Sequence, residues 1–287
     1  NVLTLIEGRH IIGAILIMYV WGEFMKSVKF VIVVLATLLI LTPLVHVIQA
    51  KSTGGPEPSL VLYLPFDEGS GDKAGDVSRY GNHGALKGSP KWVAGKFGKA
   101  LEFNGTSNWV EVPHADILTV DTAVTVMAWI KAKRLTGGAS KAQWAGIVTK
   151  SNNPRSYSFY TTSDEGGALH FSSMGGSLSK LKVALNKWQH VVAQHTGKSH
   201  IYYVNGELAG EFDGKAALPG KKDTANVVIA KSHEASREFE GIIDEVRIWN
   251  RILSAKEVTH HMNIGKNQVA VEPGGKVATT WGKLKFQ

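Results

Sequence analysis

The stretch Glu238-Phe-Glu-Gly-Ile-Ile-Asp-Glu-Val-Arg-Ile-Trp-Asn-Arg251 places carboxylates among apolar residues that alternate as they do in a β-strand. If the segment is fully extended, one face carries four residues: Ile242, Asp244, Val246 and Ile248. An ionised carboxylate that faces a core is strongly disfavoured unless it is paired with a cation or well hydrogen-bonded. Asp244 therefore needs a partner from elsewhere in the chain.

A β-bulge offers a second arrangement of the same stretch, because Gly241 can mark a bend or a bulge. A bulge at Asp244 and Glu245 would bring a different set into phase: Phe239, Gly241, Ile243, Val246 and Ile248. The sequence leaves both arrangements open. In the first arrangement Asp244 faces the core, and in the second Asp244 and Glu245 form the bulge itself.

The segment Leu253-Ser254-Ala-Lys-Glu257-Val258 follows this strand and carries the signals of a helix start. Ser254 suits the N-cap, and Glu257 occupies the third helical position, as in a capping box. Leu253 and Val258 are spaced for a hydrophobic staple. We expect a short helix that ends near Gly265.

The composition limits the chemistry that the chain can perform. The 287 residues include no cysteine, which excludes disulfides, zinc-thiolate sites, thiol nucleophiles and a lipid-anchored cysteine. The formal net charge is +8, but lysines and arginines are interleaved with acidic residues along the chain. This distribution predicts a solvated basic surface and no nucleic-acid partner.

Residues 1–50 have the pattern of a targeting sequence. Met25-Lys-Ser-Val-Lys29 is a basic segment, residues 30–41 form an uncharged apolar run, and Val47-Ile-Gln-Ala50 resembles a cleavage site. These features predict a signal peptide over residues 25–50 and a secreted or cell-surface protein, with membrane contact only if residues 30–41 stay uncleaved as an anchor. Residues 1–24 are interpreted as a start-site extension, and a second membrane segment through residues 11–21 is the weaker alternative.

The globular part is predicted to be all-β. Residues 51–59 form a Pro-, Gly- and Ser-rich linker, and short strands separated by Gly, Asn and Asp turns follow from Leu60 onward. Asn205-Gly206 is a strong hairpin signal, since both positions of that turn take positive φ. The pattern favours an antiparallel sandwich over residues 60–264 with a short C-terminal helix, followed by a tail over residues 265–287.

Three separated blocks resemble the laminin-G-like jelly-roll domains of the concanavalin A-like lectin and glucanase superfamily. They are Phe66-Asp-Glu-Gly-Ser-Gly71 with Asp76-Val-Ser78 and Gly81-Asn-His-Gly84, then Gly98-Lys-Ala-Leu-Glu-Phe-Asn-Gly105, and finally Gly241-Ile-Ile-Asp-Glu-Val-Arg-Ile-Trp-Asn250 with Leu253-Ser254. The resemblance implies a two-sheet jelly-roll sandwich. It is specific for the fold and weak for the ligand.

The resemblance also implies a structural calcium ion, because in that family the first and last blocks are adjacent in space. Calcium takes carboxylate, amide and carbonyl oxygens and tolerates irregular glycine-rich loops. The expected ligands are Asp67, Asp76, Asn82 and Asp244. The alternative is that Asp244 accepts hydrogen bonds from loop N–H groups, or pairs with an arginine, without any metal.

Three aromatic residues in the middle of the domain are the candidates for sugar binding: Trp144, Tyr157 and Tyr160. Aromatic faces combined with polar groups are typical of such sites, and Asn152, Asn153 and Arg155 lie nearby in the sequence. The alternative for each aromatic is a place in the hydrophobic core.

No catalytic residue is predicted. Glycoside hydrolysis needs two carboxylates that flank the bond, and the spacing of Glu240, Asp244 and Glu245 does not match the glucanase pattern. We therefore expect a non-catalytic module that binds glycans on a cell surface or in the matrix. The alternatives are a structural or adhesion module with an extracellular protein partner and, behind it, a glycoside hydrolase.

Overall fold

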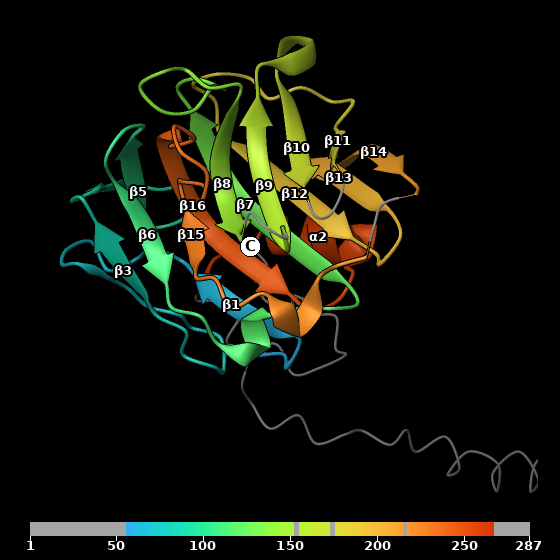
Figure 1. The fold of residues 1–287 in the computed structure, drawn as a ribbon. Coiled ribbons are helices and arrows are strands. Elements are labelled where there is room, and N and C mark those ends of the chain that lie inside the picture. The colour runs from blue at the N-terminus through green and yellow to red at the C-terminus, as the bar shows by residue number, and fades with distance from the viewer. Residues whose placement is uncertain (1–55, 152–154, 173–175, 215–216, 267–287) are drawn as a thin grey trace, which may run out of the picture. The chain divides into compact units, whose positions relative to one another are not determined.

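The computed structural model describes residues 56–151, 155–172, 176–214 and 217–266. They form two antiparallel sheets that pack face to face (Figure 1). Sheet A has the strand order β14 (Glu207–Phe212), β13 (His200–Val204), β12 (Gln189–His195), β7 (Val124–Ala132), β16 (Glu240–Trp249), β5 (Lys99–Asn104) and β4 (Lys91–Ala94), and β1 (Leu60–Leu64) also pairs with β16. The all-β sandwich prediction is confirmed.

Sheet B has the order β11 (Gly176–Leu178), β10 (Ala168–Ser172), β9 (Tyr157–Thr162), β8 (Trp144–Lys150), β15 (Val227–Ile229), β6 (Trp109–Val112), β3 (Gly84–Lys87) and β2 (Lys73–Ala74). In the part of the chain that the structure describes, three short 3₁₀ turns lie between strands: η2 (Asp116–Leu118), η3 (Asp164–Gly166) and η4 (Gly220–Lys222). The hydrophobic core lies between the inner faces of the two sheets, where residues such as Phe103, Ile130, Phe159 and Ile229 have no exposed surface.

A bulge interrupts β16 in the middle of sheet A. Asp244 lies opposite Trp129 and Arg247 lies opposite Met127, so the register shifts between them, and Glu245 has a φ of +55°. Ile243, Val246 and Ile248 therefore share the core face, whereas Ile242 is half-buried outside the core. The bulged arrangement is the one that forms, and the fully extended alternative is wrong.

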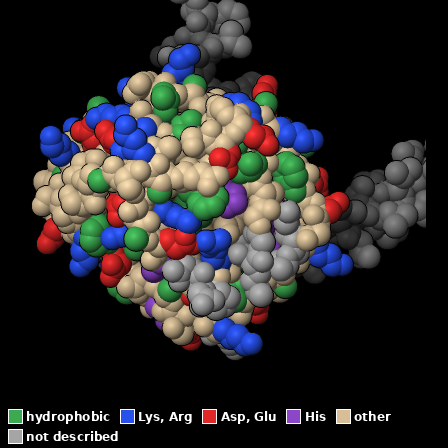
Figure 2. All heavy atoms as spheres, turned by 45° about the horizontal axis from the view of Figure 1, so that its top comes forward, with side chains coloured by type: hydrophobic (Ala, Val, Ile, Leu, Met, Phe, Trp, Pro, Cys, Tyr) green, Lys and Arg blue, Asp and Glu red, His purple; other side chains and the backbone are tan. Residues whose placement is uncertain are grey.

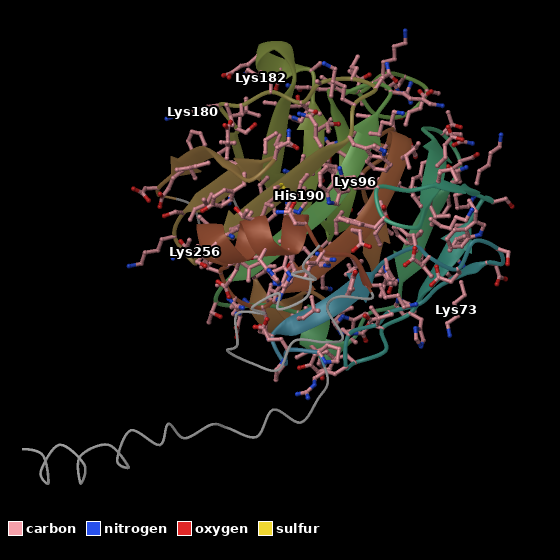
Figure 3. All side chains as sticks on the ribbon, turned by 180° about the vertical axis from the view of Figure 1, so that it is seen from behind. Lys73, Lys96, Lys180, Lys182, His190 and Lys256 are labelled. Carbon is pink, nitrogen blue, oxygen red and sulfur yellow. The ribbon has the colours of Figure 1, made fainter. Side chains whose placement is uncertain are left out.

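Helix α2 (Ala255–Met262) packs on the outer face of sheet A, as Figure 3 shows from behind with Lys256 labelled. Ser254 and Glu257 form the predicted capping box. A second apolar cluster lies between helix and sheet and consists of Leu60, Tyr63, Met127, Val192, Tyr203, Trp249, Leu253 and Val258. An isolated eight-residue helix is not stable in water. Burial of apolar side chains in this cluster is therefore what stabilises α2.

The β13–β14 hairpin forms at the predicted turn. Asn205 and Gly206 have φ values of +51° and +83°, and both signs match the type I′ turn that this residue pair favours. Further along the hairpin, the pairing of β13 with β14 shifts register between Tyr202 and Tyr203. Gly210, opposite Tyr202, adopts a φ of +135°. Strand β14, at the edge of sheet A, is thus irregular.

The predicted start-site extension, the signal peptide and nearly all of the tail lie outside the described residues. The same holds for the first part of the 51–59 linker. The first strand begins at Leu60. Among the helices that the structure describes, none is long and apolar enough to cross a membrane.

Candidate functional site

Asp244 holds the loop that joins β4 to β5. Its Oδ2 accepts hydrogen bonds from the main-chain N–H groups of Lys96 (2.8 Å) and Phe97 (3.1 Å). Asp67 holds the same loop, because its Oδ1 accepts from the N–H of Lys99 at 3.0 Å. The main-chain partners that the sequence offered as an alternative to calcium are therefore present.

The second oxygen of Asp244 has a different environment. Its Oδ1 is buried without a hydrogen-bond partner, and so is Oε1 of the neighbouring Glu245. Burial, with the negative charge of Glu245 as a smaller cause, raises the pKa of Asp244 to about 8, against the lowering by the N–H groups of Phe97 and Lys96. When both side chains are ionised, the pair forms a local excess of acceptor oxygens.

Asp76 and Asn82 hold a different segment. The carboxylate of Asp76 accepts from the N–H groups of Tyr63, Ser78 and Asn82 and from the hydroxyl of Ser78. The side-chain amide of Asn82 donates to the carbonyl of Val61 at 3.1 Å. These contacts fasten the loop after β2 to strand β1.

The four expected calcium ligands do not fit the ion equally. Four donors already point at Asp76, which leaves its oxygens poorly suited to a cation. Within the described ranges, no three acidic or histidine side chains converge in a way that could hold a metal. Two buried oxygens that a cation could satisfy are Oδ1 of Asp244 and Oε1 of Glu245.

Glu245 belongs to a buried network that joins β1, β16 and α2. Its Oε2 accepts from the hydroxyl of Tyr63 and from the guanidinium of Arg247, both at 2.5 Å. Arg247 also donates to the carbonyls of His261 and Ile264, at and just beyond the end of α2. Exposure of Tyr63, Glu245 and Arg247 is at most 2%. The network is structural, because no substrate could reach it.

The carboxylates do not form a hydrolytic site. Asp244 is fully buried and Glu245 almost so, whereas Glu240 lies half-buried against Arg134 at 3.1 Å. Two acids that flank a glycosidic bond must both be open to the substrate. The glycoside hydrolase alternative therefore gains no support from these three residues.

Two of the three predicted sugar-binding aromatics have no exposed surface. Tyr157 lies in the core between the sheets, and its hydroxyl donates to the carbonyl of Leu118 at 2.9 Å. Tyr160 points to the outer side of sheet B, but its hydroxyl is paired with Ser232 in the loop that covers it. Tyr157 is thus a core residue, and Tyr160 supports a loop; neither offers a face to a ligand.

Trp144 is half-buried on the outer face of sheet B. The pairing of Trp144 with Thr162, and of Tyr160 with His170, places all four side chains on this face. The ring of His170 stacks on the indole with centroids 5.3 Å apart and planes 20° apart. Burial lowers the pKa of His170 to about 4, so the imidazole is neutral at physiological pH.

The β15–β16 loop (residues 230–239) supplies charged groups beside Trp144. The guanidinium carbon of Arg237 lies 4.5 Å from the indole centroid, and Arg237 pairs with Glu234. Glu234 also pairs with Arg155, which in turn donates to the hydroxyl of Ser172 at 3.0 Å. We call Trp144, Arg155, His170, Glu234 and Arg237 the Trp144 surface.

A glycine lets the β15–β16 loop approach sheet B closely. The N–H of Gly146 donates to the carbonyl of Arg237 at 2.9 Å, and a Cβ at Gly146 would lie only 2.4 Å from the carbonyl oxygen of Lys231. The loop is therefore packed directly on β8, where only glycine fits. Sequence reasoning found Trp144 and Arg155 but missed His170, Glu234 and Arg237. The alternation of β10 could have indicated the outward side of His170, whereas nothing local placed the loop.

The family model described as concanavalin A-like lectin/glucanases superfamily matches residues 104–259, which is more than half of the chain. The chain belongs to this superfamily. No curated protein sequence matches the chain significantly.

Solved structures share the superfamily fold. Domain 4 of AbnA, a GH43 extracellular arabinanase from Geobacillus stearothermophilus in complex with arabinotriose, is 19% identical with a TM-score of 0.59, over 71% of this chain and 98% of that one. Two botulinum neurotoxin structures, each 16% identical with a TM-score of 0.55, match 71% of this chain and 51% of their own. The first is a structure of botulinum neurotoxin type C, whose cell entry depends on interaction with two ganglioside molecules. The second is the binding domain of botulinum neurotoxin DC in complex with rat synaptotagmin II. The chain thus spans about half the length of the toxin chains, and the likeness shows the fold.

Proposed function

We propose that the chain is an exported, non-catalytic module that binds glycans through the Trp144 surface. The observation that carries the proposal is a half-buried indole on the outer face of sheet B, in contact with the guanidinium of Arg237 and the neutral imidazole of His170. Ion pairs link Arg237 through the carboxylate of Glu234 to a second guanidinium, that of Arg155. Sugar recognition uses an apolar ring face together with a few placed hydrogen-bonding groups. Related structures that contain arabinotriose or concern gangliosides support the same class of ligand.

The Trp144 surface is ordered before any ligand arrives. His170 and Arg237 both contact the indole, and Glu234 bridges Arg155 to Arg237. A ligand therefore pays little for ordering these side chains, because their rotamers are already restricted. Trp144 is only half-buried, so its exposed part and the polar groups around it remain for a sugar.

Replacement of Trp144 tests the proposal. Binding of the purified full chain is measured on an array that includes arabinotriose and ganglioside oligosaccharides. For Trp144→Ala we expect a loss of about 1–3 kcal/mol of binding free energy with a nearly unchanged melting temperature. Tyr157→Ala is the contrasting core variant and should lose about 3–5 kcal/mol of stability.

The outcomes separate glycan binding from its alternatives. Leu208, 57% exposed on β14 of the other sheet, gives the control Leu208→Ala, which should bind as the parent does. If the parent binds no glycan, the protein-partner alternative takes precedence. On the face turned forward in Figure 2, hydrophobic side chains form small groups among basic and acidic ones, which does not favour a flat apolar docking patch there.

Export completes the proposal. The basic, apolar and small-residue segments before Lys51 support secretion with a mature terminus at that residue. N-terminal sequencing of the secreted protein checks this, and recovery of membrane-embedded protein that still carries residues 30–41 would instead support an anchor.

A further inference from the structure

A second tryptophan lies on the same outer face of sheet B. Trp109 belongs to β6, in which Val110 and Val112 point into the core, so Trp109 and Glu111 point outward. Strand β15 separates β6 from β8, because Ile229 pairs with Val110 on one side and Val148 on the other. Two strand spacings of about 4.8 Å separate β6 from β8, and the register places Trp144 about three residues, or roughly 10 Å, further along the sheet than Trp109. The backbones of the two tryptophans are therefore roughly 14 Å apart.

Trp109 has polar neighbours of its own. The ammonium group of Lys231 lies 3.8 Å from the centroid of the indole, and the indole nitrogen lies 3.5 Å from Oε2 of Glu111. The side-chain amide of Asn226 donates to the other oxygen of Glu111 at 3.0 Å. All four side chains are half-buried, so each keeps some contact with solvent. We call these four residues the Trp109 surface.

The β15–β16 loop connects the two surfaces. Its first part brings Lys231 to Trp109, and its last part brings Arg237 to Trp144. Between them, Ser232 is paired with the hydroxyl of Tyr160, and the carbonyl of Lys231 accepts from the hydroxyl of Thr149 at 3.0 Å. Because the loop is fastened to the sheet at these points, the spacing of the two indoles is fixed.

We propose that the Trp109 surface is a second glycan subsite, so that an extended oligosaccharide binds across the β15–β16 loop and contacts both indoles. The proposal rests on the function proposed for the Trp144 surface and adds the class of ligand. A separation of roughly 14 Å between the two tryptophans exceeds one sugar ring, so a chain of several linked residues is required. A carboxylate, an amide and an ammonium group beside an indole can each bond sugar hydroxyls, and two linked contacts strengthen each other through effective concentration.

The test compares short and long members of the same glycan series. The full chain is applied to an array that carries matched short and long linear oligosaccharides, arabinan-derived and ganglioside-derived series among them. The parent should bind the long members more tightly. Trp109→Ala should weaken binding of long members about tenfold and leave short members unchanged, because short members use the Trp144 surface alone. Trp144→Ala should weaken both.

Two further variants keep the test decisive if Trp109→Ala does not fold. Trp109→Phe keeps a ring and should retain most of the preference for long glycans. Glu111→Gln keeps the size of the side chain but changes its charge, and should reduce that preference several-fold. Leu208→Ala, on the other sheet, should behave as the parent.

The possible failures are distinguishable. If the folded Trp109 and Glu111 variants bind long and short members as the parent does, the second subsite is overturned while glycan binding at Trp144 stands. If the parent binds long and short members equally, the extended ligand is overturned in the same way. If the parent binds no glycan on the array, this proposal and the proposed function both fall.

Discussion

Asp244 lies at the bulge of β16 with one oxygen bonded to two N–H groups and the other without a partner. In the unfolded chain its pKa returns to the ordinary 3.8, whereas in the folded protein it is raised to about 8. Between these values the folded state holds a proton that the unfolded state has released. The contribution of the Asp244 carboxyl to the free energy of unfolding is therefore fully present below about pH 4, and it is lost as the pH rises through about 8.

The variant Asp244→Asn removes this titration while keeping the shape of the side chain. We expect the parent, with chelator present, to lose free energy of unfolding between about pH 5 and about pH 9, and the variant to lose less. Urea denaturation at the two pH values measures the difference. Equal losses in parent and variant would show that Asp244 does not titrate in this range.

The β4–β5 loop is held by the carboxylates of Asp67 and Asp244. These carboxylates occupy the space that a side chain would need at the glycines of the loop. Gly98 has a φ of +52°, and a Cβ there would lie 2.0 Å from Oδ1 of Asp67. Gly71 is the matched control, because its φ is +86° but nothing lies within 4 Å of its Cβ position. The two glycines thus differ in crowding and share the backbone conformation.

We expect Gly98→Ala to destabilise the protein more than Gly71→Ala does. The control incurs only the backbone strain of about 1–2 kcal/mol that a left-handed residue carries, whereas Gly98→Ala also displaces Asp67 from the N–H of Lys99. Thermal or urea unfolding of both variants gives the comparison. Equal destabilisation would mean that the Asp67 contact contributes nothing to the loop.

The elements that sequence could predict are those with local signals. The Asn205-Gly206 turn and the Ser254 capping box each depend on a few neighbouring residues, and both form as predicted. The bulge in β16 was left open because both phases of that strand carry apolar residues, and only pairing with Met127 and Trp129 of β7 selects one of them.

The candidate site was predictable only in part, for a related reason. Strand β9 carries aromatics on both faces, so alternation alone does not separate Tyr157 in the core from Tyr160 on the outer face. Tyr160 is then covered by a loop more than 70 residues away in the sequence. Contacts of that kind come from tertiary packing, and no local pattern records them.

Calcium binding by the protein remains a prediction. The unpartnered oxygens of Asp244 and Glu245 are the atoms at which we expect the ion. An ion bound only by the folded state stabilises it by mass action. We expect added calcium to raise the melting temperature of the parent and chelator to lower it, and Asp244→Asn to abolish the response. A melting curve unaffected by chelator, together with metal-free analysis of the protein, would leave main-chain hydrogen bonding as the full account of Asp244.

Strand β14, at the edge of sheet A, influences whether copies of the chain associate with one another. An unpaired strand edge invites another chain to add to the sheet, which is a route to aggregation. Here the shift opposite Tyr202, the left-handed Gly210 and the exposed carboxylates of Glu207 and Glu211 interrupt the regular edge. An incoming strand would meet a twisted backbone and negative charge, which disfavours pairing of copies through this edge.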